Sequence, residues 1–162
     1  MIVVANSGPL IALAQIGHFW LLESLFSQLH IPPAVWDEVV RSGRGRAGAV
    51  EVDVEPWMRI ATVHDLTAVQ LLQERLDIGE SEAIVLALEL DADLLLIDEA
   101  RGRRVAEARG LNKAGAVGLL VMAKKRGLVT QIEPLLEELR AKGFRMSDEL
   151  YQTALSSAGE GL

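Results

Sequence analysis

Two short apolar runs in the chain end in side chains that carry oxygen. A β-branched run, IVVA, ends at Asn6 and Ser7, and a second run, LLLI, ends at Asp98 and Glu99. Ligands of an open parallel sheet bind beyond the carboxyl ends of its strands. If the two runs are neighbouring strands, these side chains lie at one rim. Asp98 directly adjoins an apolar run, where a charge without a partner would be poorly solvated.

Three more acids are expected at the same rim. Glu80 and Glu82 fall in the first turn of a helix that leads into the LLLI strand, and Glu38 lies on the less apolar side of an earlier helix. Carboxylates gathered at one place repel each other unless a cation lies between them, and Mg²⁺ or Mn²⁺ prefers oxygen ligands. Such an ion activates water and stabilises phosphoryl charge. The predicted metal ligands are Asn6, Glu38, Glu80, Glu82, Asp98 and Glu99, with Glu38, Glu80, Glu82 and Asp98 as the catalytic acids.

These residues also have purely structural interpretations. Asn6 and Ser7 can cap a helix, and Ser7 is expected to do so in either case. Glu80 and Glu82 are favourable near a helix N-terminus whatever the function. Glu99 is expected to pair with Arg103 at an i,i+4 spacing. Glu38 is by default a surface acid.

The elements that must position these side chains alternate along the chain. Apolar runs predict strands at about 2–5, 30–31, 57–63 and 93–97. Helical periodicity predicts helices at about 10–16, 20–29, 33–41, 66–76, 78–90, 102–109, 116–126, 132–142 and 147–157. Residues 42–49 lack periodicity and predict a mobile loop. Strands that alternate with helices indicate an α/β fold with a parallel sheet between helices.

Composition narrows the classes of function. The chain has 162 residues, half of them apolar, which suits one domain with a sizeable core. It has no cysteine, so it offers neither a disulfide framework nor a thiolate metal site. No apolar run reaches the roughly 20 residues of a membrane helix. The N-terminal residues lack a basic leader. We therefore expect a cytoplasmic protein without a membrane partner.

The net charge of −7 averages two unlike parts of the chain. Residues 1–100 carry a balance of −11, whereas residues 101–145 carry +7. A basic segment beside an acidic rim suits a protein that gathers cations at one place and phosphates at another. The residues expected to contact those phosphates are Ser7, Arg101, Arg103, Arg104 and Lys113.

Several segments together resemble a prokaryotic branch of the PIN-domain-like proteins. The segments that carry the resemblance are VVANSGPLIALAQIG, IPPAVWDEVV, LDIGESEAIVLALELDADLLLIDEARGRRVAEARGL, AGAVGLLVMAKKRGLV and LEELRAKGFRMSDELYQTAL. The resemblance covers nearly the whole chain. It implies a PIN-like three-layer sandwich with one domain over residues 1–162, on which the helices from about 132 pack.

The resemblance also implies a function. PIN enzymes are Mg²⁺- or Mn²⁺-dependent ribonucleases, many of them toxins of toxin–antitoxin pairs and often dimers. Their acids correspond here to Glu38, to Glu80 or Glu82, and to Asp98, while the first position holds the neutral Asn6. A fifth acid that some PIN enzymes carry has no counterpart in residues 112–115.

Three functions remain open at this point. The leading prediction is a metal-dependent ribonuclease that acts on RNA and has an antitoxin protein and a second copy of itself as partners. The alternative is a catalytically silent module that binds RNA or a protein. A phospho-acceptor domain that uses Asp98 and Lys113 ranks lower, because Asn6 supplies no second acid.

Overall fold

A five-stranded parallel sheet forms the centre of the computed structural model, which describes residues 1–161. Its strands are β1 (Val3–Ala5), β2 (Leu29–Ile31), β3 (Met58–Ile60), β4 (Leu94–Leu96) and β5 (Lys113–Ala114). The order across the sheet is β3-β2-β1-β4-β5. The chain therefore moves outward in one direction from β1 to β3, and β4 and β5 extend the sheet on the other side of β1. The reversal lies between β1 and β4, the point at which open α/β sheets bind ligands.

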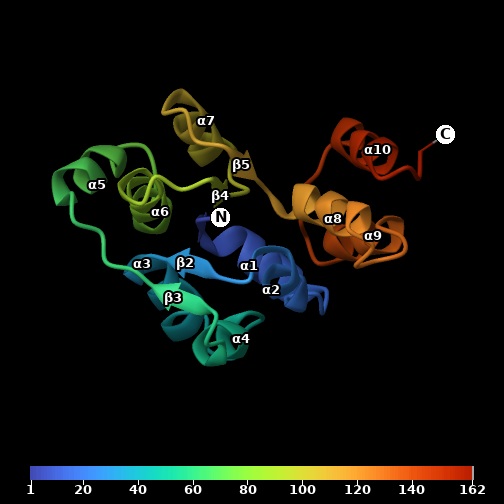
Figure 1. Cartoon of the computed structure of the whole chain (residues 1–162), viewed down its shortest axis with the longest axis horizontal. Helices are drawn as coiled ribbons and strands as arrows, with labels where there is room; N and C mark the ends of the chain where they lie inside the picture. Colours follow the sequence, from blue (N-terminus) through green and yellow to red (C-terminus); the bar gives the residue numbers. More distant parts are fainter. Residues whose placement is uncertain (162) are drawn as a thin grey trace.

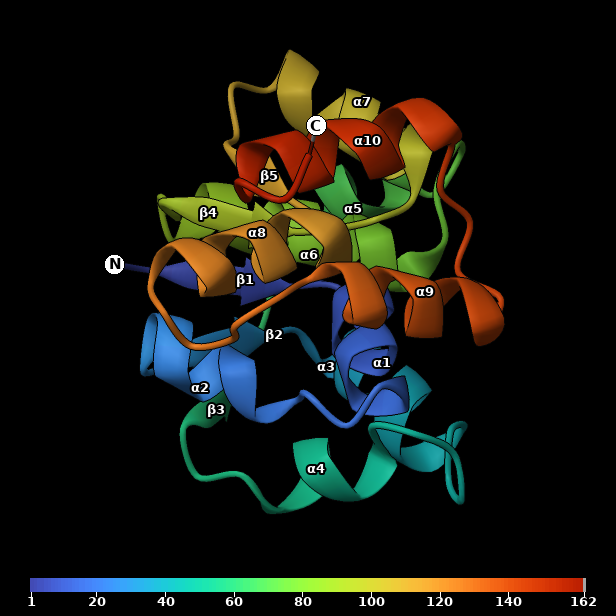
Figure 2. The same cartoon turned by 90° about the vertical axis from the view of Figure 1, so that its right-hand side faces the viewer.

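Helices cover both faces of the sheet (Figures 1 and 2). One face carries α1 (Ser7–Gln15), α2 (Trp20–Phe26), α8 (Ala116–Lys125), α9 (Glu133–Ala141) and α10 (Asp148–Ser157). The other face carries α5 (Leu66–Leu72), α6 (Ile78–Glu89) and α7 (Ala100–Ala108). Near β2 and β3 lie α3 (Pro33–Trp36), the π-helix η1 (Asp37–Arg41) and α4 (Ala49–Val54). The predicted α/β sandwich of three layers is confirmed.

Side chains of successive strand residues enter opposite layers, as the pleat of a strand requires. In β1, Val3 and Ala5 belong to the core beneath α1 and α8, whereas Val4 belongs to the core beneath α6. In β4, Leu96 faces the first core and Leu95 the second. Both strands are buried on both sides, which explains why they are uninterrupted apolar runs.

Several predicted elements differ from the structure. The strand β5 was not predicted, because its two residues form no apolar run. The helix α4 follows the predicted loop at 42–49 and was also missed. The first helix begins at Ser7, not at about 10, so Asn6 occupies the N-cap position. The prediction that Ser7 caps this helix is wrong, since Ser7 is its first residue and no side chain caps it.

Across residues 1–161, none of the helices is both long and apolar enough to cross a membrane.

Candidate active site

The carboxyl ends of β1 and β4 lie side by side at the reversal of the strand order. Ala5 pairs with Leu96, and the backbone N–H of Asn6 donates to the carbonyl of Leu96 at 2.9 Å. Asn6 and Asp98 therefore leave the sheet at one corner. The Asn6 side chain is only 5% exposed. An added Cβ at Gly79, in the first turn of α6, would lie 3.5 Å from Asn6 Oδ1, so this oxygen is aimed at the start of α6.

Asp98 is held by the beginning of α8. Its Oδ1 accepts a hydrogen bond from the backbone N–H of Ala116 at 2.9 Å, and a Cβ at Gly115 would overlap that oxygen. Only glycine permits this approach. Asp98 Oδ2 is buried and has no hydrogen-bond partner in the described residues. An added Cβ at Gly8 would lie 3.7 Å from it, so Oδ2 faces the first turn of α1.

Burial raises the pKa of the Asp98 carboxyl. The hydrogen bond from Ala116 and the positive charge of Arg103 oppose this shift without cancelling it. The Arg103 side chain is fixed beside Asp98, because its Nη1 donates to the carbonyl of Ile97 at 2.8 Å. A buried acid with a raised pKa in a rim of this kind is typical of a functional site.

Glu80 belongs to a capping box at the start of α6. Its backbone N–H donates to Asp77 Oδ1 at 2.8 Å, and its Oε1 accepts from the backbone N–H of Asp77 at 3.4 Å. The residue is 6% exposed, and its Oε2 has no hydrogen-bond partner among residues 1–161. A Cβ at Gly102 would come within 2.8 Å of that oxygen. The glycine therefore lets α7 approach α6 closely.

Burial is the largest cause that raises the pKa of Glu80, to about 7. Hydrogen bonding with the Asp77 side chain and the negative charges of Asp77 and Glu99 also raise this pKa, whereas the hydrogen bond from the Asp77 backbone N–H lowers it without cancelling the rise. The protein thus holds an acid that exchanges its proton near neutral pH and whose charged form lacks a counterion. Sequence reasoning did not identify Asp77, although D-x-x-E before an apolar run is the pattern of a capping box.

The other predicted acids lie in different surroundings. Glu82 Oε1 accepts from the backbone N–H of Ala34 at 3.0 Å, so it satisfies the first turn of α3. Glu99 is the N-cap of α7 and accepts from the backbone N–H of Arg101 at 3.1 Å. The expected ion pair between Glu99 and Arg103 is not formed. Glu38 is exposed on η1. No three acids or histidines of residues 1–161 converge closely enough to hold a metal by themselves.

The predicted RNA-contacting residues divide between two hollows. Arg103 and Lys113 line a cavity of about 510 Å³ that includes Asp98. Arg101 and Arg104 line a separate hollow of about 440 Å³ against α7, and Arg101 Nη1 donates to the carbonyl of Arg75 at 3.2 Å. Ser7 is buried next to Asn6. One rim therefore carries Asn6, Ser7, Glu80, Asp98 and Arg103, whereas Lys113 Nζ lies 3.4 Å from Glu107 Oε2 of α7.

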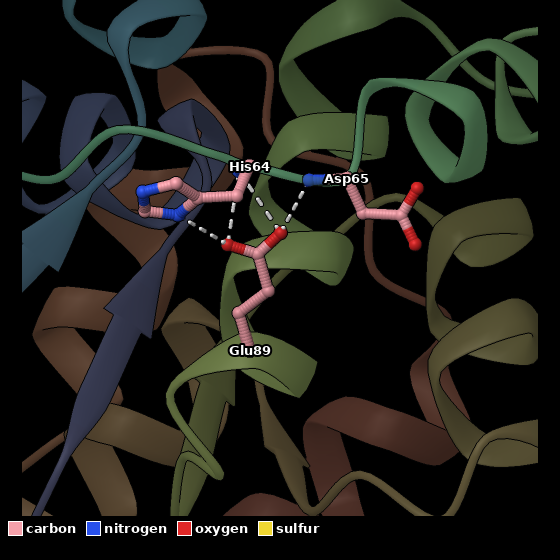
Figure 3. A network of polar contacts seen from close by, with 3 residues as sticks. All are labelled: His64, Asp65 and Glu89. Atoms are coloured by element: carbon pink, nitrogen blue, oxygen red, sulfur yellow. Dashed lines mark hydrogen bonds and ion pairs between the residues drawn. The ribbon is translucent and has the colours of Figure 1, made fainter.

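A different polar cluster lies at the C-terminal end of α6 (Figure 3). The Glu89 carboxylate accepts from the backbone N–H groups of His64 (3.0 Å) and Asp65 (2.8 Å), and it lies 3.2 Å from His64 Nδ1. The Asp65 side chain points away from Glu89 and caps α5 by accepting from Ala68. Burial alone would raise the pKa of Glu89, but the hydrogen bonds from Asp65 and His64 lower it below its ordinary value. This cluster fastens the segment before α5 and is structural.

Comparison with known proteins agrees with the geometry. A sequence profile described as a PIN domain matches residues 2–160. A search of curated proteins finds no match to the chain.

Proposed function

The chain belongs to the PIN-domain family, and from this premise we propose that it is a Mg²⁺- or Mn²⁺-dependent ribonuclease that hydrolyses phosphodiester bonds of RNA. One observation carries the proposal. Glu80 Oε2 and Asp98 Oδ2 are buried carboxylate oxygens with no hydrogen-bond partner in residues 1–161, at the corner where the sheet reverses its order. Burying a charge without a counterion is costly. A divalent cation removes that cost for both acids.

The donor set suits a hard cation. Glu80 and Asp98 supply charged oxygens and Asn6 Oδ1 supplies a neutral one, which are ligand types that Mg²⁺ and Mn²⁺ accept together with water. Asp77 fixes the rotamer of Glu80 through its backbone N–H, and Ala116 fixes that of Asp98. The first residues of α6 and α8 therefore prepare the ligands before any cation arrives.

Each residue then has a separate role in hydrolysis. When bound, the ion lowers the pKa of a water ligand and neutralises charge on the phosphoryl oxygen. Arg103, fastened to the carbonyl of Ile97, presents its guanidinium beside Asp98, where it would bind an oxygen of the scissile phosphate. Lys113 lines the same cavity and would neutralise a neighbouring phosphate. Glu80, with a pKa of about 7, releases its proton as the cation binds.

Glu38, Glu82 and Glu99 remain predicted members of a wider ligand set. The hydrogen bond from Ala34 to Glu82 and the capping role of Glu99 favour Glu80 and Asp98 as the direct ligands. A change of the Glu82 rotamer would release the N–H of Ala34 and free the carboxylate. Mn²⁺ affinity of Glu80→Gln and Glu82→Gln would show which of the two acids binds the ion.

Cleavage of RNA tests the proposal. We expect the purified protein to cleave single-stranded RNA in Mn²⁺ and not in EDTA, and Asp98→Asn to lose at least about a hundredfold in rate, because one charged ligand is removed. Asp53→Asn, the same change on the exposed face of α4, is the control and keeps full activity. Equal rates for Asp98→Asn and the wild type would refute the assignment of the site.

A silent module that binds RNA or a protein is the second candidate. The neutral Asn6 and the lack of a third converging acid in residues 1–161 favour it. Calorimetry separates the two, since a silent module releases no heat with millimolar Mn²⁺ and shows no thermal shift.

We extend the proposal to the protein's partners. The chain would act as the toxin of a toxin–antitoxin pair, with an antitoxin protein as inhibitor, and would assemble as a homodimer. Light scattering coupled to size exclusion measures the assembly, and growth arrest on expression, relieved by Asp98→Asn, measures toxicity.

A further inference from the structure

The cavity beside Asp98 is larger than a metal site requires. Its volume is about 510 Å³, within the roughly 300–1,000 Å³ of small-molecule sites. It is bounded by β5, by α8, by the connection between α9 and α10, and by α10 itself. Figure 1 shows α8 and α10 close together beside β5, and the two helices pack against each other. Asp98 and Arg103 are among the residues that line it.

The charged groups of this cavity are mostly cationic. Arg103, Lys113, Lys125 and Arg145 line it, and Asp98 is the one acid among its described lining residues. Lys113 also pairs with Glu107, whose Oε2 lies 3.4 Å from its Nζ. This excess of positive charge arises in a chain whose net charge is −7. Positively charged side chains grouped in a hollow attract anions. In nucleic acids, Arg and Lys bind the phosphates of the backbone.

Most of the uncharged residues that line the cavity are apolar. Val117 and Val121 lie one turn apart on α8, and Phe144 and Leu150 border the same space from the C-terminal segment. Thr153 and Ser157, one turn apart on α10, add two hydroxyl groups. A flat, largely apolar group with polar edges suits such a lining. Nucleobases are of this kind, and they stack on aromatic rings regardless of sequence.

We infer that the cavity bounded by β5, α8 and α10 binds a single nucleotide of the RNA, next to the phosphate held at Asp98. The base lies over Val117, Val121 and Phe144, the hydroxyl groups of Thr153 and Ser157 contact its edge, and Lys125 and Arg145 contact the backbone. The inference rests on the proposed ribonuclease function, because that function identifies the ligand as RNA. Its consequence is a preference for one base beside the cleaved bond.

Binding of free nucleotides in EDTA tests the cavity without involving a metal. The four ribonucleoside monophosphates and inorganic phosphate are titrated separately and followed by NMR. We expect at least one nucleotide to bind at least tenfold more tightly than inorganic phosphate. Equal affinities would reduce the cavity to an anion site and overturn the inference.

Two variants with matched controls locate the binding. Thr153→Trp fills the cavity from α10, and Thr67→Trp places the same residue on the exposed face of α5. Arg145→Glu reverses a charge in the lining, and Arg44→Glu does so on the remote loop before α4. We expect about a tenfold loss of nucleotide affinity for the first variant of each pair and none for the control. If each variant and its control lost the same amount of nucleotide affinity, the inference would be contradicted.

Two further measurements distinguish the ligand's source and class. An RNA tetranucleotide, which stays uncleaved in EDTA because the proposed hydrolysis needs the metal, should bind more tightly than the mononucleotide. Equal affinity would overturn the assignment to RNA. An acidic peptide that binds in place of any nucleotide would assign the cavity to a protein partner and would also overturn it.

Failure of this inference is separable from failure of the proposed function. Asp98→Asn should abolish Mn²⁺ binding and leave nucleotide binding in EDTA intact or stronger, because it removes a negative charge from the cavity. A wild-type protein that binds no Mn²⁺ would refute only the proposed nuclease function. A wild-type protein that binds no nucleotide in EDTA would refute only the proposed nucleotide site.

Discussion

Glu80 and Asp98 combine two properties that seldom persist without a function. Each has a buried carboxylate oxygen with no hydrogen-bond partner in the part of the chain that the structure describes, and burial raises the pKa of each. Glycine at 102 leaves room for Glu80 Oε2, and glycine at 115 leaves room for the other oxygen of Asp98, Oδ1, where a Cβ would otherwise lie. The fold therefore tolerates a destabilising pair at the corner where β1 and β4 end, which is typical of a site kept for a cation.

Stability of the metal-free protein should depend on Glu80. Its pKa is about 7 in the folded protein and 4.5 in the unfolded chain. Between these values the folded state binds more protons, so the free energy of unfolding falls as the pH rises from about 4.5 to 7. Glu80→Gln removes this slope. We expect it to raise stability at pH 8 by roughly 1–2 kcal/mol, measured by urea denaturation in EDTA.

Glu138→Gln, at an exposed position of α9, is the control for that measurement. It should leave both the slope and the stability unchanged. A Glu80→Gln variant that is less stable than the wild type at pH 8 would show that the carboxylate is already neutralised.

Asn6→Asp should strengthen metal binding. The change replaces a neutral oxygen by a charged one of nearly the same shape, at a buried position aimed at the start of α6. Attraction to a divalent ion at an effective dielectric near 20 is of the order of a few kcal/mol before desolvation. We expect Mn²⁺ affinity to rise about tenfold in calorimetry, and apo stability to fall slightly.

Asn112→Asp is the matched control, because it precedes β5 and so lies toward the opposite edge of the sheet. Unchanged or weaker Mn²⁺ binding in Asn6→Asp would mean that Asn6 does not face the ion.

At the scale of elements, long regular patterns could be predicted and short ones could not. The helix at 78–90 was predicted from a long segment that is apolar almost all round, and it is observed at Ile78–Glu89, although the D-x-x-E capping box that starts it was missed. The pairing of β1 with β4 follows from two buried runs, and it places Asn6 beside Asp98 as expected. By contrast, β5 has two residues, and its place in the sheet depends entirely on contacts with β4.

The candidate site divides in the same way. Asp98 and Glu80 were identified from strand ends and a helix start, which are local signals. The bond from Ala34 to Glu82 joins residues 48 apart, and the cavity under α10 joins β5 to the C-terminal helix. Such contacts depend on packing between distant segments, and no spacing in the sequence encodes them.

The polar cluster of His64, Asp65 and Glu89, which holds the segment before α5, gives a prediction about stability. The pKa of Glu89 is lowered, so the charged form stabilises the fold above the unfolded value of 4.5, and this contribution is lost as the pH falls through the lower folded value. Glu89→Gln should reduce stability at pH 7 by about 1 kcal/mol, the typical net worth of a hydrogen bond, and by less near pH 3. Urea denaturation at both values, with Glu138→Gln as control, measures the difference; a loss that is the same at both would contradict the charge-dependent explanation.

The whole molecule separates its charges along the chain. The first hundred residues are acidic and supply Glu80 and Asp98, whereas residues 101–145 are basic and supply Arg103, Lys113, Lys125 and Arg145. The two parts meet where β4 ends. A net negative protein with cationic hollows beside β5 and against α7 should repel nucleic acid over most of its surface and bind it at those places.

The salt dependence of RNA affinity shows how many phosphates these cations contact. If three to four cations contact RNA phosphates, the logarithm of affinity should fall with the logarithm of salt concentration with a slope of about −2 to −3 for a single strand. Fluorescence anisotropy in EDTA gives the slope, and Arg145→Glu should reduce it while Arg44→Glu should not. A slope near zero would exclude phosphate contacts as the basis of RNA binding.

A crystal structure determined from crystals grown in Mn²⁺ tests the central claim most directly. The account predicts an anomalous peak at about 2.2 Å from both Glu80 Oε2 and Asp98 Oδ2, with Asn6 Oδ1 turned toward it, and no such peak in Asp98→Asn. An empty corner at saturating Mn²⁺, or a peak held by other acids while these two oxygens stay unpartnered, would contradict it.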